Sequence, residues 1–289
     1  MNHSRRKFLQ TGSMLAAGAL FSSNKLFAEP SSRRLKKFGI QLWSVRDDMA
    51  KDPAGVLQQL ASYGYKQIES CDLDKGIFWG MTNTGFKKRL DDLGLECHST
   101  HTDVYAKDFE QKVNDCAAAG IKYIIYAWEG PGKTLDDYKR MTDDFNKKGE
   151  LCRRAGMKFA FHNHAFTFVQ LEGQYAQDVL MQHTDPLNVY FEMDMYWVVT
   201  AGQDPAAWLK KYKNRFTLCH IKDRSKTAAP EDSDASCNLG TGTIDFASLL
   251  PIARKCGMDY FYVEQERWDG STPMLSAQAD ADYMKGVRV

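Results

Sequence analysis

The chain has 289 residues, of which 43% are hydrophobic and 26% are charged, and its formal net charge is +1. This composition is ordinary for a globular protein with one large core. A near-neutral chain without a basic block beyond its N-terminus lacks the charge that nucleic-acid binding requires. Its seven cysteines are scattered and include no Cys-x-x-Cys pair, so we expect neither a disulfide framework nor a structural zinc site.

The N-terminus is typical of an export signal. The twin arginine Arg5-Arg6 is followed by a modest apolar run over 14–21 and by a small-residue ending that resembles a cleavage site. The twin-arginine export machinery recognises such signals and moves folded proteins across the membrane, which predicts a periplasmic protein. The alternative is a disordered basic tail. We therefore assign 1–28 to the signal and 29–289 to the folded domain.

Short apolar runs alternate with amphipathic stretches through the rest of the chain. The apolar runs predict strands, and Gly, Pro and Asp residues mark where the intervening helices begin and end. The predicted strands, in chain order, are 38–43, 66–69, 95–101, 123–128, 158–164, 189–194, 216–223 and 260–266. The helices that follow them in turn are 52–63, 84–93, 108–119, 135–155, 175–183, 205–212, 245–256 and 273–286.

Eight strand–helix units in about 260 residues have the size of a single closed (β/α)₈ barrel with a parallel sheet. The alternative is an open, doubly wound sheet. It lacks support because no Gly-x-Gly-x-x-Gly follows the first strand. The sequence therefore predicts one α/β domain of the TIM-barrel class.

The carboxyl ends of the predicted strands carry residues that bind metals or move protons, and in such a barrel these ends meet at one mouth. They are Glu69, His98, His101, His162, Asn163, His164, Asp194, His220, Lys222, Asp223, Glu264 and Glu266. Alternate residues of a strand share a face, and the pairs that do so are His220 with Lys222, His162 with His164, and Glu264 with Glu266. Such a mixed Asp/Glu/His set suits one divalent ion, Mn²⁺, Mg²⁺, Co²⁺ or Zn²⁺.

Several longer stretches resemble the xylose-isomerase-like barrel superfamily of sugar phosphate isomerases and epimerases. The stretches that carry the resemblance are MDMYW (193–197), AGQDP (201–205), HIKD (220–223), LGTGTIDF (239–246) and VEQ (263–265). Their order and spacing make the match specific, and it runs from residue 38 to the C-terminus. The FHNH motif at 161–164 is more similar to an exported isomerase-like branch than to the xylose isomerases themselves.

The resemblance implies a metal held by one residue from each of strands five to eight. Asp194, His220 and Glu264 match the last three ligand positions. At the first position, where relatives have glutamate, this chain has His162. The fourth metal ligand is therefore His162, His164 or a water molecule. With histidine in place of glutamate, the ligand set carries one negative charge fewer than in the relatives, which favours borderline metals over Mg²⁺.

The resemblance also implies a sugar isomerase or epimerase that removes a proton next to a carbonyl, with the resulting enediolate stabilised by the metal. The expected catalytic residues are Glu264 as base, with Lys222, His101 and Glu69 in proton transfer or hydroxyl binding. For Glu69 the alternative is a structural ion pair. The residues expected to contact the sugar are His164, Trp197 and Glu266.

Other functions remain open on the same fold. A lyase or hydratase acting on a keto-sugar would use the same metal site, and the change at His162 leaves room for a non-catalytic sugar-binding barrel. The related DNA-repair endonucleases share the fold, but the near-neutral charge and the export signal disfavour that function. We expect an unphosphorylated sugar or sugar derivative as substrate, because Gly240-Thr241-Gly242 predicts a tight turn rather than an anion site. A homo-oligomer is also left open.

Overall fold

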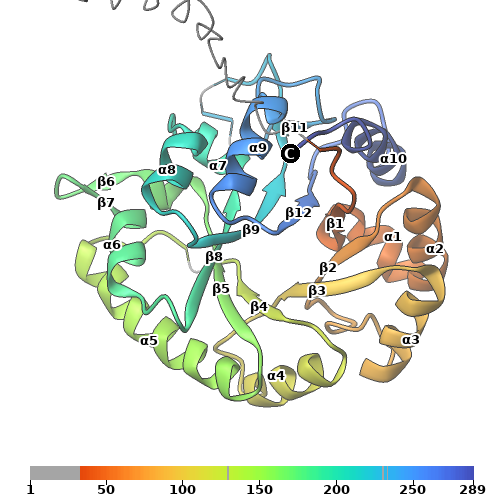
Figure 1. Cartoon of the computed structure of the whole chain (residues 1–289), viewed down its shortest axis with the longest axis horizontal. Helices are drawn as coiled ribbons and strands as arrows, with labels where there is room; N and C mark the ends of the chain where they lie inside the picture. The colour runs from red at the N-terminus through yellow and green to blue at the C-terminus, as the bar shows by residue number, and fades with distance from the viewer. Residues whose placement is uncertain (1–32, 129, 230, 233) are drawn as a thin grey trace, which may run out of the picture. The chain divides into compact units, whose positions relative to one another are not determined.

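The computed structural model describes residues 33–289 except 129, 230 and 233. Eight parallel strands close into a barrel in which each pairs with the next along the chain and β12 pairs with β1. They are β1 (Gly39–Gln41), β2 (Gln67–Cys71), β3 (Glu96–His101), β4 (Tyr123–Tyr126), β5 (Lys158–His162), β8 (Val189–Asp194), β9 (Phe216–Ile221) and β12 (Tyr260–Val263). This ring confirms the predicted barrel (Figure 1). The expected export signal, 1–28, lies outside the described residues.

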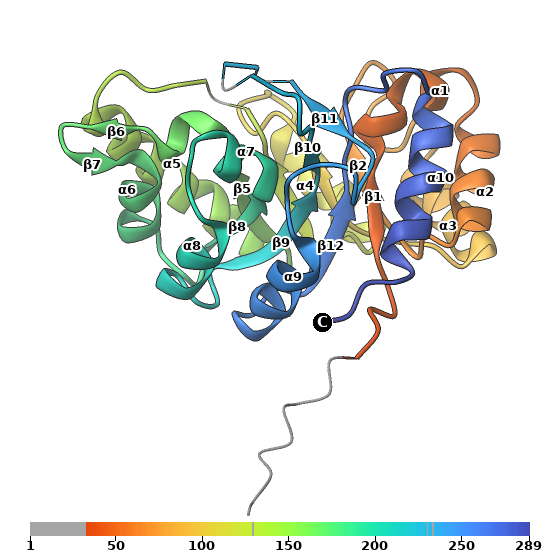
Figure 2. The ribbon, with the colours of Figure 1, turned by 90° about the horizontal axis from the view of Figure 1, so that it is seen from above.

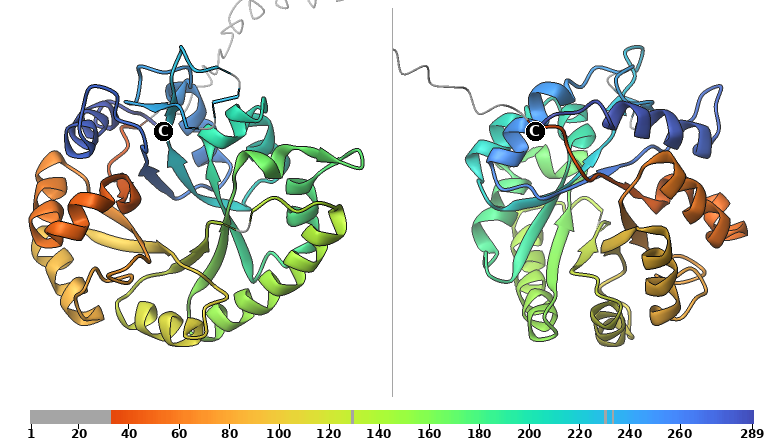
Figure 3. Two further views of the ribbon diagram at one scale, coloured as in Figure 1. Left: turned by 180° about the vertical axis from the view of Figure 1, so that it is seen from behind. Right: turned by 45° about the vertical axis from the view of Figure 1, so that its right-hand side comes forward.

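Helices cover the outside of the strand ring, as the views from the two sides show (Figures 1 and 3). They are α2 (Pro53–Tyr63), α3 (Asn83–Leu93), α4 (Phe109–Ala118), α5 (Leu135–Arg154), α6 (Ala176–His183), α8 (Pro205–Lys211), α9 (Phe246–Lys255) and α10 (Pro273–Met284). Local signals explain their ends. Asp52 caps α2 by accepting from the Gly55 N–H at 2.9 Å, and α3 ends at Gly94, whose φ of 65° favours glycine. Within the described part of the chain, no helix is both long and apolar enough to cross a membrane.

Short elements that the sequence did not predict follow several strands at the mouth (Figure 2). They are η1 (Leu42–Val45), α1 (Arg46–Lys51), η2 (Ala165–Phe168), α7 (Met195–Thr200), and the two-stranded pairs β6 (Gln170–Leu171) with β7 (Gln174–Tyr175) and β10 (Asp223–Arg224) with β11 (Ser236–Cys237). Helix α7 was missed because its sequence, MYWVVT, is poor in strong helix formers. Several strands also end earlier than predicted, so that Lys222 and Glu264 lie just after β9 and β12.

The barrel interior changes from apolar to polar toward the carboxyl ends of the strands. The apolar part is a cluster made of Tyr123, Ile125, Ala160, Leu218 and Tyr262. Because side chains alternate, the next inward positions are His162 after Ala160, His220 after Leu218 and Glu264 after Tyr262. The polar residues therefore lie on an apolar base that gives them a low-dielectric environment.

The structure corrects the expectation for His98, which the sequence grouped with the residues at the mouth. The His98 ring contacts the Glu96 carboxylate at 3.0 Å and the Tyr260 ring at 4.9 Å between centroids. Glu96 and Tyr260 are the first residues of β3 and β12. His98 thus points toward the amino ends of the strands, away from the site.

A buried carboxylate in α10 makes the stability of the fold depend on pH. Asp280 is 1% exposed and accepts a hydrogen bond from the Leu239 N–H at 2.8 Å. Burial raises the pKa of Asp280 to about 7. Between the ordinary aspartate value of about 3.9 and this raised value, the folded protein holds a proton that the unfolded chain has lost. The free energy of unfolding therefore falls as the pH rises through this window.

We expect Asp280→Asn to stabilise the protein more at pH 8 than at pH 5, by about 2 to 3 kcal/mol. Asparagine keeps an acceptor oxygen for Leu239 but does not ionise. Urea unfolding of both proteins at the two pH values measures the difference. Asp282→Asn, at an exposed position of the same helix, is the matched control and should show no pH-dependent gain. An equal gain from Asp280→Asn at both pH values would contradict the assignment.

Candidate active site

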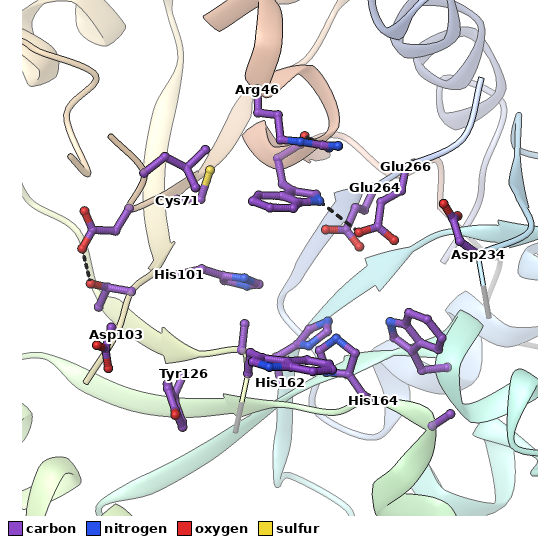
Figure 4. Close-up of a pocket in the computed structure, with 18 of the residues that line it drawn as sticks. Arg46, Cys71, His101, Asp103, Tyr126, His162, His164, Asp234, Glu264 and Glu266 are labelled. Atoms are coloured by element: carbon purple, nitrogen blue, oxygen red, sulfur yellow. Dashed lines mark hydrogen bonds between the residues drawn. The ribbon is translucent and has the colours of Figure 1, made fainter. Parts of the chain in front are cut away.

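A cavity of about 1010 Å³ opens among the loops at the carboxyl ends of the strands. Of the residues predicted to form the site, those that line it are His101, His162, His164, Trp197, Glu264 and Glu266. Figure 4 shows His101 on one side of this cavity and Glu264 with Glu266 on another. The remaining predicted residues, which are fully buried and do not line the cavity, are Asp194, His220, Lys222 and Glu69.

Four of the predicted metal ligands converge around one point. His162, Asp194 and His220 each offer an atom within 4.8 Å of the others. Asp194 Oδ2 lies 3.5 Å from His162 Nε2 and 3.7 Å from His220 Nδ1, and Glu264 Oε2 lies 3.2 Å from His220 Nδ1. Ligands bound about 2.0–2.2 Å from a tetrahedral ion would lie about 3.3–3.6 Å apart. The spacing therefore fits a single divalent cation.

The hydrogen bonding of these atoms supports the same fit. Both ring nitrogens of His162, Asp194 Oδ2 and His220 Nδ1 are buried and have no hydrogen-bond partner. Buried polar atoms are rarely left without a partner. Burial also lowers the pKa of His162 to about 4, so its imidazole is neutral near pH 7, as a metal ligand must be. A bound cation would give a partner to one nitrogen of His162, to Asp194 Oδ2 and to His220 Nδ1.

The local structure fixes the Asp194 carboxylate in a ligand orientation. Its Oδ1 accepts from the backbone N–H groups of Tyr196 at 2.8 Å and Trp197 at 3.3 Å, which caps α7. Asn163 ties β5 to β8, because its amide donates to the Asp194 carbonyl at 3.1 Å and accepts from the Asp194 N–H at 3.2 Å. Asp194 Oδ2 alone is left to face His162. Asn163 was predicted among the residues at the barrel mouth, but its role in holding Asp194 in place was not predicted.

The other nitrogen of His220 faces a second buried group. His220 Nε2 lies 2.7 Å from Glu69 Oε1, and Glu69 also accepts from Gln41 Nε2 at 2.9 Å and from the Ser99 hydroxyl. A carboxylate behind the non-ligating nitrogen fixes the tautomer and orientation of a metal-binding histidine. Glu69 does not line the cavity. Its position suits the alternative of a structural ion pair, which here orients His220, better than the expected role in proton transfer or hydroxyl binding.

Glu192 belongs to this second group and was not among the residues predicted from the sequence. Glu192 Oε2 lies 2.8 Å from His101 Nε2 and 3.3 Å from His220 Nε2, and Glu69, His101, Glu192 and His220 together form a cluster with metal-ligand spacing. Burial and the charge of Glu69 raise the pKa of Glu192 to about 7. The signal was present in the sequence, since Glu192 precedes Asp194 by two residues and so shares its face.

His101 links this buried group to the cavity. Its ring stacks on His220 with 5.3 Å between centroids and an interplanar angle of 16°. Burial acts to lower its pKa, but the charges and hydrogen bonds of Glu69 and Glu192 outweigh burial and raise the pKa of His101 to about 9. His101 is therefore a charged donor at the edge of the cavity.

Lys222 and Glu266 form an ion pair beside the predicted metal ligands. Lys222 Nζ donates to Glu266 Oε2 and lies 3.5 Å from Glu264 Oε2. The Trp43 indole N–H donates to Glu266 Oε1 at 3.0 Å. Burial and the charge of Glu264 raise the pKa of Glu266. Lys222 is buried behind the two carboxylates, whereas Glu266 reaches the cavity and can contact a ligand there.

The residues expected to contact a sugar, besides Glu266, are aromatic neighbours. The His164 ring lies 4.9 Å from the His162 ring and 5.3 Å from Trp197, between centroids, and Lys222 Nζ lies 5.0 Å from the centre of the Trp197 ring. Burial lowers the pKa of His164 to about 3. The His164 ring contacts the His162 ring, and His162 is the residue that lies next to Asp194. The geometry therefore favours His162 over His164 as the fourth metal ligand.

The Gly240-Thr241-Gly242 turn is already occupied by a side chain of this protein. Asp223 Oδ2 accepts from the N–H groups of Gly240 and Gly242, both at 3.0 Å, and Asp223 Oδ1 accepts from the Ile244 N–H at 3.0 Å. A Cβ on Gly242 would lie 2.2 Å from Asp223 Oδ1. These backbone donors are used internally, in agreement with the expected tight turn.

Comparison with known proteins places this arrangement in a family. Residues 57–287 match the profile of the xylose isomerase-like TIM barrel family. The chain belongs to this family. An inosose dehydratase of Clostridium perfringens is 36% identical over 145 residues, which cover 46% of this chain and 48% of that protein. The match thus spans about half the length of this curated relative.

Solved structures agree at the level of the fold. A sugar phosphate isomerase/epimerase from Parabacteroides distasonis is 28% identical, with a TM-score of 0.74 over 88% of this chain and 95% of that one. The IolI protein, whose crystal structure contains a zinc atom, is 15% identical, with a TM-score of 0.71 over 85% of this chain and 95% of that one. The chain is thus a member of an enzyme family with a sugar-processing fold and a candidate divalent-metal site.

Proposed function

We propose that this xylose isomerase-like barrel is a metal-dependent dehydratase acting on a keto-cyclitol or keto-sugar. The observation that carries the proposal is the cation-binding geometry of His162, Asp194, His220 and Glu264. Two of these residues, His162 and Glu264, line the same cavity as the proton-transfer candidates His101 and Glu266. The inosose dehydratase relatives support elimination. They favour the lyase alternative left open by the sequence over its first expectation of an isomerase or epimerase.

A bound divalent cation would polarise the substrate carbonyl, which eases removal of the adjacent C–H proton. In the proposed reaction, the base is Glu266 in place of Glu264, the base expected from the sequence, because Glu264 lies among the cation ligands. The Glu266 carboxylate accepts that proton, while Lys222 and the Trp43 indole hold the carboxylate in place. The C–O bond at the next carbon then breaks. His101, on another side of the cavity (Figure 4), donates a proton to the departing hydroxyl, so the net change is loss of one water.

Isomerisation and epimerisation begin with the same proton removal, so the test must separate outcomes after that step. Purified, Mn²⁺-loaded protein is incubated in deuterated water with an inosose and with a panel of keto-sugars. We expect a product that has lost one water, with formation stopped by a chelator and restored by Mn²⁺. Deuterium incorporation without loss of water would instead identify an isomerase or epimerase. If neither deuterium incorporation nor loss of water occurs, the result would favour a non-catalytic sugar-binding barrel.

A further inference from the structure

The cavity is larger than one sugar ring requires. Its volume of about 1010 Å³ lies at the upper end of the roughly 300–1,000 Å³ found for pockets that enclose drug-sized ligands. Two of the proposed metal ligands, His162 and Glu264, line the cavity together with Glu266. The part that we call outer is lined by the end of β4 and by the segments that follow β2, β3, β4 and β5, with Leu73, Asp103, Tyr126, Trp128 and Phe166.

Trp128, in the loop after β4, is the most exposed aromatic residue in the outer part of the cavity. Its side chain lines the cavity and yet is 62% exposed. Edge-to-face contacts hold the ring in place, at 4.8 Å from His164 and 5.9 Å from Phe166 between centroids. A large aromatic side chain that is exposed but held by packing is preorganised to cover a flat ligand.

The aromatic contacts continue from Trp128 to the proposed metal site. Phe166 and His164 are stacked with an interplanar angle of 2° and 5.7 Å between centroids, and His164 contacts both Trp197 and His162. A ligand ring stacked on Trp128 would meet Phe166 at its edge, because the two planes are nearly perpendicular. The His164 ring contacts both Trp128 and His162, so such a ligand ring would lie near the proposed metal site.

Polar side chains also line the cavity. Asp103 lies on the side of Tyr126, whereas Arg46 and Asp234 lie on the side of Glu266 (Figure 4), and the Arg46 guanidinium is held over the Trp43 ring at 4.4 Å. An aromatic platform with polar groups around it suits a ring with an apolar face and hydroxyls at its edge.

We infer that the outer part of the cavity is a second subsite, in which Trp128 and Phe166 bind the substituent ring of a glycoside whose first ring lies at the metal end. The shared chemistry of this substituent is a flat apolar face, which a pyranose and an aromatic ring both offer. The inference deepens the proposed function and rests on it for the placement of the first ring.

Calorimetric titration of the Mn²⁺-loaded protein with methyl β-D-glucoside, cellobiose and phenyl β-D-glucoside tests the subsite. These ligands share the first ring and differ in the substituent. We expect at least one of the two-ring ligands to bind about tenfold more tightly than the methyl glucoside. Cellobiose and phenyl glucoside separate a sugar-binding from an aromatic-binding subsite. Equal affinities for all three ligands, or binding of none, would overturn the inference.

Three variants isolate the role of the indole. Trp128→Ala should remove the roughly tenfold gain of the two-ring ligand and change the affinity for methyl glucoside less than twofold, whereas Trp128→Phe should retain most of the gain. Leu187→Ala, which removes another exposed apolar side chain, 73% exposed and outside the cavity lining, should change neither affinity. An equal loss for the one-ring and two-ring ligands in Trp128→Ala would overturn the subsite.

The subsite and the proposed function can fail separately. Selective loss of two-ring binding in Trp128→Ala, together with no loss of water from any keto substrate, would support the subsite and reject the dehydratase. Loss of water from an inosose, together with equal binding of all three glucosides, would support the dehydratase and reject the subsite.

Discussion

Replacing His220 with alanine should release the divalent metal and lower the rate of substrate dehydration by about a thousandfold or more. His220 Nδ1 lies among the predicted ligand atoms, at 3.2 Å from Glu264 and 3.7 Å from Asp194. Without the imidazole, the two carboxylates would lack the nitrogen ligand between them. A metal that stabilises developing charge by about 4 kcal/mol or more accounts for a rate factor of this size.

Metal content, measured by mass spectrometry of the purified protein, and dehydration rate should fall together in this variant. Because His220 is fully buried, Asp194→Asn provides a second test that disturbs packing less. Its remaining carbonyl oxygen can still cap α7 by accepting from the Tyr196 N–H, as Asp194 Oδ1 does, while the ligand oxygen is replaced by an amide. His183→Ala, at an exposed histidine at the end of α6, is the control. Full metal occupancy in both the His220→Ala and the Asp194→Asn variants would contradict the proposed metal site.

Replacing Glu266 with glutamine should lower kcat by about 10² to 10⁴, the range that general acid–base catalysis contributes, with little change in metal content. Glutamine has the same shape and can still accept the Trp43 indole hydrogen bond seen at 3.0 Å. It cannot accept the substrate proton. The effect should therefore appear in kcat, because the substrate still binds at the metal end.

Steady-state kinetics and metal analysis of the same preparation separate this role from ligation. Glu96→Gln removes an exposed carboxylate at the opposite end of the barrel, where Glu96 pairs with Lys37, and should leave kcat unchanged. Loss of metal from Glu266→Gln would assign Glu266 to the ligand set. An unchanged kcat would assign the base to another residue.

The family profile, and not a motif alone, supports the resemblance recognised from the sequence. The inosose dehydratase relatives favour a dehydratase over the isomerase or epimerase that was expected from the sequence. The family resemblance predicted chemistry that begins with removal of a proton next to a carbonyl, and this step is common to isomerases and dehydratases. The outcome at the next carbon depends on whether an acid, for which we propose His101, can protonate the departing hydroxyl.

Local patterns were enough to predict the barrel and most of its inward-facing chemistry. The period-two pattern of strands placed His220 and Lys222 on one face, and capping residues such as Asp52 marked helix ends, because both depend only on neighbours along the chain. Strand ends were less well predicted, since loops such as the one beginning at Leu42 turn according to the packing above the barrel mouth.

Closure of the barrel decided the rest of the site. Glu69 on β2 and His220 on β9 are 151 residues apart, and they meet only because the ring brings strands that are not neighbours together around one interior. The same closure turns one nitrogen of His220 toward the metal ligands and the other toward Glu69, and it brings Glu192 next to His101. The sequence by itself determined which side chains enter the barrel, and the tertiary structure decided which of them touch, because those contacts cross the barrel rather than follow the chain.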